Sequence, residues 1–385
     1  MKQFFVDLHI HVGRDWNGRP VKITGSKSLT LTNIVEEASR RKGLDMVGVI
    51  DAQAPAVQDE ITHLIQTGKA EEIKGGGIRF EHTVLILGSE IEVYDASCSG
   101  PIHVLCYFPT LKQMESFTAW LAEKMKNINL SSQRFYGTAR ELQQYVKDHE
   151  GIFIPAHMFT PFKSLYGKGV KKTLKEVLDA DKIDAVELGL SADTEMAGLI
   201  GELSPYTYVT NSDAHSLGKL AREYQKIEMA GLTFEELRLA LHDAEGRRVA
   251  VNYGMSPKMG KYHQTVCAKC LTPAFETQNQ CGECGSRKIV KGVKDRIEEL
   301  KSDQQERFRP PYVYQVPLLS LPGVGKRTYE KMLEVFGSEM EVIHEASKEK
   351  LLEVVPADVV KNVMALREGT LHISAGGGGR YGRIQ

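Results

Sequence analysis

Short β-rich runs alternate with helical patterns from residue 1 to about residue 251. The runs read FFVDLHIHV, MVGVIDA, HTVLILGSEIEV, IHVLCYF, GIFIPAH, AVELGLS and YTYVTNSDAH, and segments such as NIVEEASRRKG and FTAWLAEKMKNI stand between them. This alternation of strand-like and helical segments predicts βα units that form a parallel sheet or barrel. In such folds the active residues lie at the carboxyl ends of the strands.

Acidic residues and histidines recur in these runs, where a barrel would gather them at one mouth. Taken singly, Asp51 could cap a helix, His103 could hydrogen-bond in the core and Asp213 could make a turn. Together they are costly in a core, because buried charges need partners. A shared cation supplies that partner, so we predict a metal site built from His9, His11, Asp51, Glu90, His103, His157, Asp213 and His215.

This set offers more nitrogen and oxygen ligands than one zinc ion accepts, so we predict two or three divalent ions. Histidine-rich coordination favours zinc or manganese, and magnesium stays open. In an extended chain successive side chains alternate between faces. We therefore expect Phe5, Asp7, His9 and His11 on one face of the first strand, and Phe4, Val6, Leu8 and Ile10 on the other.

Length and charge set only broad limits. The 385 residues predict two or three domains, and 49 Lys and Arg nearly balance 50 Asp and Glu. A polyanionic partner would therefore be recognised by local charge. No apolar run approaches the roughly 18 residues of a membrane span, and the N-terminus lacks a basic segment followed by an apolar one. We expect a cytoplasmic protein that does not bind a membrane.

Four cysteines form two CxxC pairs separated by ten residues. Each pair can make a tight turn that directs two thiolates at one ion. The pattern predicts a tetrahedral four-cysteine zinc ribbon with one structural zinc, held by Cys267, Cys270, Cys281 and Cys284. Four unpaired thiols brought together by chance are the alternative.

Positive charge gathers around this ribbon and a glycine-containing turn follows it. Between Lys258 and Lys294 seven basic residues stand against two glutamates, which suits a phosphate backbone, although a solvated basic loop is the alternative. Further on, LPGVG resembles a helix-hairpin-helix turn, whose backbone N–H groups approach a DNA phosphate. Gly323 and Gly325 would form this turn, with Lys326 beside the phosphate, and an ordinary Pro-Gly turn is the alternative.

Several motifs resemble those of the PHP (polymerase and histidinol phosphatase) superfamily. They are DLHIH near the start, SE after an apolar strand, PAH in mid-chain and NSDAH near the end of the barrel. Members are distorted barrels of about seven βα units with a multinuclear metal site, and they hydrolyse phosphoesters. The resemblance implies a distorted (βα)7 PHP barrel over residues 1–255. A zinc ribbon over 256–292 and a small helical, DNA-binding region with a glycine-rich tail over 293–385 would follow.

Matched by position, His9 and His11 fall in the first motif, Glu90 in the second and His157 in the third, with Asp213 and His215 in the fourth. The resemblance assigns catalysis to Glu90, His157, Asp213 and His215, with Asp213 at the heart of the cluster. Many members have Thr-Asp-His where this chain has Ile50, Asp51 and Ala52, so the match is weaker at Asp51. Water activated by the bound ions would attack the phosphorus in line, and no protein nucleophile is needed.

The order of these parts resembles the endonuclease Q family of PHP-type DNA repair enzymes over nearly the whole chain. That resemblance implies hydrolysis on the 5′ side of deaminated bases (uracil, hypoxanthine, xanthine) and abasic sites in single- or double-stranded DNA. The products would carry 3′-hydroxyl and 5′-phosphate ends. A PHP-type exonuclease or small-molecule phosphoesterase is one alternative, and a DNA-binding protein whose barrel has lost catalysis is another.

The segment HMFTPFKSLYGKGVKK mixes aromatic residues with lysines directly after a predicted metal ligand. Aromatic rings can stack on bases while lysines bind phosphates. We therefore predict that Phe159, Lys163 and Lys168 bind the DNA strand at the metal site. A surface loop whose aromatic residues pack against the barrel is the alternative.

Overall fold

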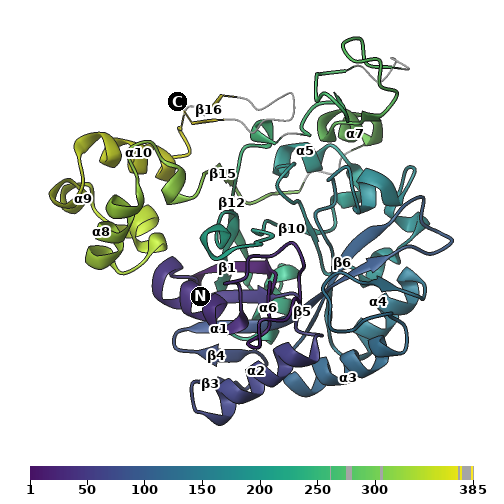
Figure 1. Ribbon diagram of the computed structural model, residues 1–385, viewed down its shortest axis with the longest axis horizontal. Coiled ribbons are helices and arrows are strands. Elements are labelled where there is room, and N and C mark those ends of the chain that lie inside the picture. The colour runs from purple at the N-terminus through teal and green to yellow at the C-terminus, as the bar shows by residue number, and fades with distance from the viewer. Residues whose placement is uncertain (261, 275–279, 304–306, 372, 375–382, 385) are drawn as a thin grey trace.

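The computed structural model describes residues 1–260, 262–274, 280–303, 307–371, 373–374 and 383–384. An α/β barrel forms its largest part (Figure 1). The strands that line the barrel are β1 (Lys2–Ile10), β2 (Met46–Val49), β5 (Thr83–Val93), β6 (Ile102–Phe108), β8 (Ile152–Pro155), β9 (Ala185–Glu187) and β10 (Thr207–Val209).

Backbone hydrogen bonds close the barrel. The strands pair in the order β1–β2–β5–β6–β8, and β9 pairs with β10. Between β8 and β9, Asp184 N donates to Phe153 O at 3.0 Å, and beyond β10 His11 N donates to Ala214 O at 3.1 Å. The end of β1 therefore lies beside the segment that follows β10.

The expectation of an all-parallel barrel is wrong at β6. This strand runs antiparallel to both β5 and β8. Eight residues separate β5 from β6, too few for the crossover of a dozen or more residues that a parallel connection requires. Because β6 is reversed, its first residues lie at the end of the barrel where the parallel strands finish. His103, the second residue of β6, is thereby brought to that end.

Further strands extend the sheet on both sides. β11 (Tyr224–Met229) pairs antiparallel with β1 and with β12 (Arg248–Gly254), and β15 (Tyr312–Tyr314) pairs parallel with β12. β3 (Ala70–Glu72) and β4 (Ile78–Phe80) form a hairpin on β5, and β7 (Arg134–Phe135) runs parallel to the end of β5.

Helices pack around the outside of the barrel, where α2, α3 and α4 lie along one flank (Figure 1). The helices in this part of the chain are α1 (Leu31–Glu36), α2 (Pro55–Gln66), α3 (Leu111–Ala122), α4 (Ala139–Asp148), α5 (Thr194–Gly198) and α6 (Phe234–Leu241). Threonine hydroxyls cap α1, α3, α4 and α6 by accepting a backbone N–H of the first turn, which satisfies one of the unpaired donors there.

The chain after the barrel forms two smaller parts. β13 (Val266–Cys267) and β14 (Ile289–Val290) form a short hairpin followed by α7 (Val293–Leu300). Helices α8 (Lys326–Phe336), α9 (Lys348–Val354) and α10 (Ala357–Arg367) gather beside α1, at the left of Figure 1. β16 (Ile373–Ser374) pairs with β17 (Arg383–Ile384), and the rest of the glycine-rich tail lies outside the described residues.

The C-terminal helices are fastened to the barrel by buried polar contacts. Lys42, in the π-helix Glu37–Lys42, and Glu339 are both almost fully buried and form an ion pair at 2.5 Å. Glu339 also accepts from Tyr329 Oη and Leu318 N, both at 2.9 Å. Among the residues described, no helix combines the length and apolar character needed to cross a bilayer.

Candidate active site

A β-bulge in β1 aims the first two histidines at the mouth of the barrel. The register with β2 shifts between Asp7 and Ile10. Val6 and Leu8 accordingly pack in one buried apolar cluster, which also contains Met46 and Ile86. Ile10 packs in a different cluster, which contains Val49 and Leu87. The expectation of unbroken alternation along this strand is wrong, because the extra residue of a bulge re-aims the side chains after it.

The bulge gives Asp7 a role separate from His9 and His11. Its carboxylate accepts from Ser212 N at 3.0 Å and from Ala221 N at 3.1 Å. Burial raises the pKa of Asp7 to about 6. Asp7 therefore supports the segment that carries Asp213.

Glu187 orients His9. The Nδ1 of His9 lies 2.9 Å from Glu187 Oε1, while its buried Nε2 has no hydrogen-bond partner among the described residues. Glu187 also accepts from His157 N and Asn211 Nδ2. Burial alone would raise the pKa of Glu187, but the His9 imidazole holds it below its usual value. A carboxylate behind one ring nitrogen leaves the other free to bind a cation, as in metal-ligating histidines.

His11 is oriented in the same way by Asp51. Asp51 Oδ2 lies 3.0 Å from His11 Nδ1 and accepts from Val12 N at 2.8 Å. His11 Nε2 points the other way and lies 3.4 Å from Asp213 Oδ1. The structure thus brings Asp51 behind His11 and does not bring it into a group of potential ligands. Its contacts favour a positioning role.

Glu90 lies at the centre of the histidines. Its Oε2 is 3.0 Å from His103 Nδ1, 3.3 Å from His157 Nε2 and 3.4 Å from His9 Nε2. Lys22 Nζ lies 3.3 Å from Glu90 Oε1. Burial would raise the pKa of Glu90, but His103 and Lys22 hold it well below its usual value. The carboxylate therefore stays charged in a buried place.

Asp213 and His215 complete the cluster from the segment after β10. Asp213 Oδ1 lies 3.5 Å from His9 Nε2 and 3.5 Å from His215 Nδ1. Its backbone is left-handed, with φ of +45°, and His157 has φ of +30°. Such backbones are uncommon for these residues and concentrate at functional sites. Arg222 holds this segment by donating to Ser212 O at 2.6 Å and Asp213 O at 3.2 Å.

Three overlapping groups of side chains have ligand atoms within 4.8 Å of one another: His9, His11 and Glu90; His11, Asp213 and His215; Glu90, His103 and His157. The ring nitrogens of buried His103 lie beside carboxylates, with Nδ1 3.0 Å from Glu90 Oε2 and Nε2 3.7 Å from Glu92 Oε2. Buried imidazoles gathered around charged carboxylates fit divalent cations. Seven of the eight predicted ligands are brought together here.

Glu187, Lys22 and Arg222 contact the cluster although sequence reasoning missed them. Glu187 lies within the run AVELGLS and is the last residue of β9, so an acidic residue in a strand-like run was a signal that could have found it. Lys22 and Arg222 lie in irregular or loop segments, where no periodicity indicates the direction of a side chain.

The loop after His157 differs from its prediction at one residue. Phe159 is only 1% exposed, and its ring stacks on that of Tyr166. The prediction that Phe159 contacts DNA is therefore wrong, because its ring completes the core. Phe162 is instead 49% exposed. Lys163 and Lys168 are exposed, as DNA contacts would require, and Lys163 pairs with Glu92 at 2.8 Å.

Two cavities adjoin the cluster of histidines and carboxylates. A cleft of about 430 Å³ is lined by four of the five clustered histidines, all but His9, with Lys22, Phe162 and Lys163. A second cavity of about 120 Å³ is lined by Gly189, Asn211 and Arg222 and shares His157 and Asp213 with the cleft. Gly189 has φ of +69°, and a Cβ there would lie 2.7 Å from the His157 Cβ. Only glycine lets these two segments approach so closely.

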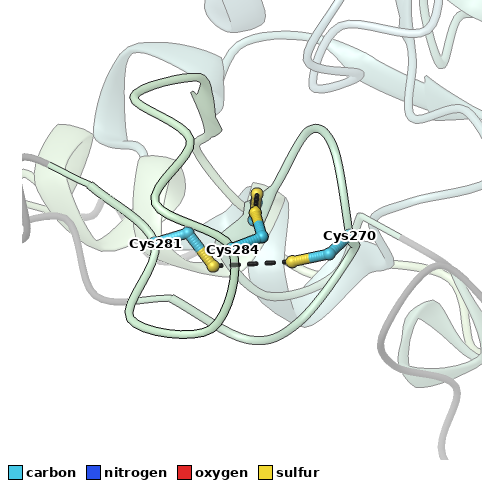
Figure 2. Close-up of side chains that lie close together, drawn as sticks. Cys270, Cys281 and Cys284 are labelled. Carbon is cyan, nitrogen blue, oxygen red and sulfur yellow. Dashed lines mark hydrogen bonds between the residues drawn. The ribbon is translucent and has the colours of Figure 1, made fainter.

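The four cysteines of the CxxC pairs converge, and Figure 2 shows Cys270 and Cys281 facing each other. Their sulfurs are 3.5 Å apart, and those of Cys267 and Cys284 are 3.6 Å apart. Tetrahedral zinc with Zn–S bonds of about 2.3 Å places sulfurs about 3.8 Å apart. The cluster is therefore consistent with the predicted zinc ribbon.

The LPGVG segment forms a turn into α8. Gly323 has φ of +83°, and Gly325 is the N-cap of α8, with nothing within 4 Å of where its Cβ would be. Lys326 is exposed at the start of the helix. No side-chain hydrogen bond caps the N-terminus of α8, as the predicted turn requires.

Comparisons with known proteins agree with this geometry. No family model matches the chain. The uncharacterised protein YqxK of Bacillus subtilis is 51% identical over 386 residues, which cover the whole of both chains. A crystal structure of PfuEndoQ, a lesion-specific endonuclease from Pyrococcus furiosus, matches with a TM-score of 0.85 and 33% identity, covering 100% of this chain and 95% of that one. The chain belongs to the endonuclease Q family.

A second endonuclease Q structure is a complex with a 27-mer duplex substrate that carries an abasic lesion at the active site. It matches with a TM-score of 0.84 and 33% identity, covering 100% of this chain and 96% of that one. The full-length match to endonuclease Q confirms the predicted fold class. Membership of this family also confirms the predicted enzyme class, a metal-dependent endonuclease.

Proposed function

We propose that this endonuclease Q family member nicks damaged DNA. It would hydrolyse the phosphodiester on the 5′ side of deaminated bases (uracil, hypoxanthine or xanthine) and of abasic sites. The products would be a 3′-hydroxyl and a 5′-phosphate end. The complex of the related endonuclease Q with an abasic duplex supports the abasic substrate.

The observation that carries this proposal is the cavity of about 120 Å³ that shares His157 and Asp213 with the open cleft. A phosphodiester in the cleft would lie beside the clustered ligands while the adjoining nucleotide enters the cavity. Enzymes that inspect a base extrude it from the stack, and damaged or mismatched pairs open at lower cost. A cavity beside a reaction centre fits that requirement, and an exonuclease or a small-molecule phosphoesterase has no need of it.

Two or three divalent ions fit the three ligand groups, with zinc or manganese favoured and magnesium as a third candidate. When bound, such ions supply a hydroxide nucleophile near neutral pH and neutralise the phosphate. The metal ligands in this proposal are His9, His11, Glu90, His103, His157, Asp213 and His215. Of these, Glu90, His157, Asp213 and His215 border the substrate cleft and are the proposed catalytic residues.

The chain's other residues hold this arrangement. Glu187 and Asp51 accept from, and thereby fix, the Nδ1 atoms of His9 and His11. Lys22 and Lys163 line the cleft and add positive charge where a DNA phosphate would lie. Arg222 ties the Asp213 backbone in its left-handed conformation.

The later parts of the chain would bind the flanking duplex. We assign residues 1–255 to the catalytic barrel, 256–292 to the zinc ribbon and 293–385 to the C-terminal DNA-binding region. Gly323, Gly325 and Lys326 would grip one phosphate at the N-terminus of α8. Lys168 would add a phosphate contact from the loop after His157.

The test is incision of end-labelled duplexes that carry one deoxyuridine, one deoxyinosine, one abasic site or no lesion. We expect a single nick immediately 5′ of each lesion, abolished by a chelator and absent from intact DNA. Mapping the ends by ligation and phosphatase treatment should give a 3′-hydroxyl and a 5′-phosphate. Equal trimming of all duplexes from their ends would contradict the proposal and favour an exonuclease.

A further inference from the structure

Two exposed tyrosines directly follow β5 and β7, and an arginine begins β7, beyond the metal-ligand cluster. The Arg134 guanidinium carbon is 5.1 Å from the centre of the Tyr94 ring and 5.3 Å from that of the Tyr136 ring. Lys126 Nζ lies 5.8 Å from the centre of the Tyr136 ring. We call Tyr94, Lys126, Arg134 and Tyr136 the tyrosine–arginine ladder.

The ladder continues the strand that carries Glu90. Glu90 and Glu92 both contact His103, so they share one face of β5. Tyr94 follows Glu92 by two residues, about 13 Å along an extended chain from Glu90. This span equals about four stacked nucleotides of one DNA strand. The parallel register of β7 with β5 brings Arg134 beside Glu92.

The two tyrosine rings are not part of the hydrophobic core. Tyr94 is 41% exposed and Tyr136 is 49% exposed. Phe135, between Arg134 and Tyr136, is fully buried and packs against Trp120 at 5.2 Å between ring centres. Phe135 therefore anchors β7, while its neighbours face solvent. Exposed ring faces beside a guanidinium group can stack on bases and bind the backbone.

The nearby carboxylates do not pair with the positively charged residues of the ladder. Glu92 pairs with Lys163 and Glu141 pairs with Lys124, both at 2.8 Å. Asp95 accepts from Ala139 N at 2.7 Å and from Ser97. Among the described residues, Lys126 and Arg134 have no acidic partner within ion-pair distance. The ladder is thus a cationic, aromatic surface, which is complementary to a strand of nucleic acid.

We propose that the ladder binds the DNA strand that runs through the metal cleft. Exposed bases would stack on Tyr94 and Tyr136, and phosphates would lie against Arg134 and Lys126. The proposal rests on the proposed function, since it takes DNA as the substrate. It adds a strand-binding surface about four nucleotides from the site of incision.

The test compares parent protein with the double variant Tyr94→Ala/Tyr136→Ala on DNA with one deoxyuridine, in chelator so that no cutting occurs. One substrate has ten nucleotides on both sides of the lesion, and two others are shortened to two nucleotides on one side. We expect the variant to bind the long DNA about 30-fold more weakly than the parent. On one shortened substrate the difference should vanish, because that strand cannot reach the ladder.

Matched variants separate stacking from general damage. Tyr94→Phe/Tyr136→Phe keeps both ring faces and should bind like the parent. Phe308→Ala removes another exposed aromatic residue, 83% exposed, that lines a cavity with Arg248 at the opposite end of the barrel. It should also bind like the parent. Arg134→Gln should lower the slope of log Kd against log salt by about 0.7 to 0.9.

The proposal would be overturned if the parent and the double variant bound the long DNA with equal affinity. It would also be overturned if the double variant lost the same affinity on every substrate. These outcomes are independent of the incision assay. If the parent cut lesion DNA while the double variant bound normally, the ladder alone would be wrong. If the parent cut no lesion while the variant still lost affinity in a length-dependent way, the proposed function alone would be wrong.

Discussion

At the scale of single residues, the carboxylates behind the histidines decide what the cluster can bind. Glu187 and Asp51 each contact an Nδ1 atom, so the Nε2 atoms of His9 and His11 face Glu90 and Asp213. In neutral imidazole only the nitrogen without a proton can bind a metal. The buried carboxylates therefore select the tautomer that a metal site needs.

Replacing Glu187 by glutamine should weaken metal binding by about 10- to 100-fold, because the amide fixes the His9 tautomer less well. Metal affinity measured by competition with a chromophoric chelator checks this result. Asp184→Asn is the matched control, since Asp184 is a buried carboxylate just before the same strand but pairs with Lys147. If Glu187→Gln bound metal as tightly as the parent, Glu187 would not be what fixes the His9 tautomer. The same would follow if Asp184→Asn lost as much metal affinity as Glu187→Gln.

Glu223 is a buried carboxyl that should make stability fall with rising pH. Its Oε1 accepts from Met255 N at 2.9 Å, its Oε2 has no partner among the described residues, and burial raises its pKa to about 8. The folded protein therefore keeps a proton that the unfolded chain loses near pH 4.3. Stability declines as pH rises through this window, by about 2 kcal/mol between pH 6 and pH 8.

Urea unfolding of the parent and of Glu223→Gln at pH 6 and pH 8 checks this prediction. The glutamine variant stays neutral, so its stability should lack this decline, and it should gain relative to the parent at pH 8. A decline of the same size in both proteins would mean that Glu223 is ionised without cost in the folded state.

At the scale of elements, the sequence predicted which side chains gather better than the way they are brought together. The seven clustered side chains could be predicted, because acidic residues and histidines at strand ends meet at one mouth of any barrel. The bulge in β1 and the reversal of β6 could not. The residue types of β1 do not reveal where its bulge lies. The β5–β6 connection is short enough to predict an antiparallel strand only when the ends of both strands are known.

The loop after His157 shows the same limit for aromatic residues. Phe159 and Phe162 lie three residues apart in one irregular segment, yet one is buried and the other is half exposed. Residue type alone does not separate a core ring from a binding ring where no periodicity applies.

The zinc ribbon should lose its metal when one cysteine is changed. Cys270→Ser is expected to lower bound zinc by one ion per chain and to make residues 256–292 sensitive to protease, since such sites supply folding energy directly. The barrel should keep its melting temperature, and Cys98→Ser should keep all its zinc. Elemental analysis with limited proteolysis measures both effects. Unchanged zinc content in Cys270→Ser would contradict a four-cysteine site.

At the scale of the whole molecule, contacts across the parts hold them in one arrangement. Arg296 of α7 donates to Tyr166 O at 2.8 Å and to Val170 O at 2.9 Å, and so ties the ribbon side to the loop after His157. Lys42 and Glu339 tie the C-terminal helices to the other side of the barrel. Removing one partner of a buried ion pair costs about 3–5 kcal/mol. Both later parts of the chain are therefore held against the barrel by specific contacts.

The measurement that tests the central claim most directly is the single-turnover rate of nicking a deoxyuridine duplex by metal-stripped and manganese-reloaded protein, for the parent and for Asp213→Asn. Reloading should restore the 5′ nick in the parent. The variant should stay slower by on the order of a thousandfold, because Asp213 touches both His9 and His11 at the centre of the cluster. A stripped parent that nicks at full rate, or an Asp213→Asn protein that nicks like the parent, would contradict the account.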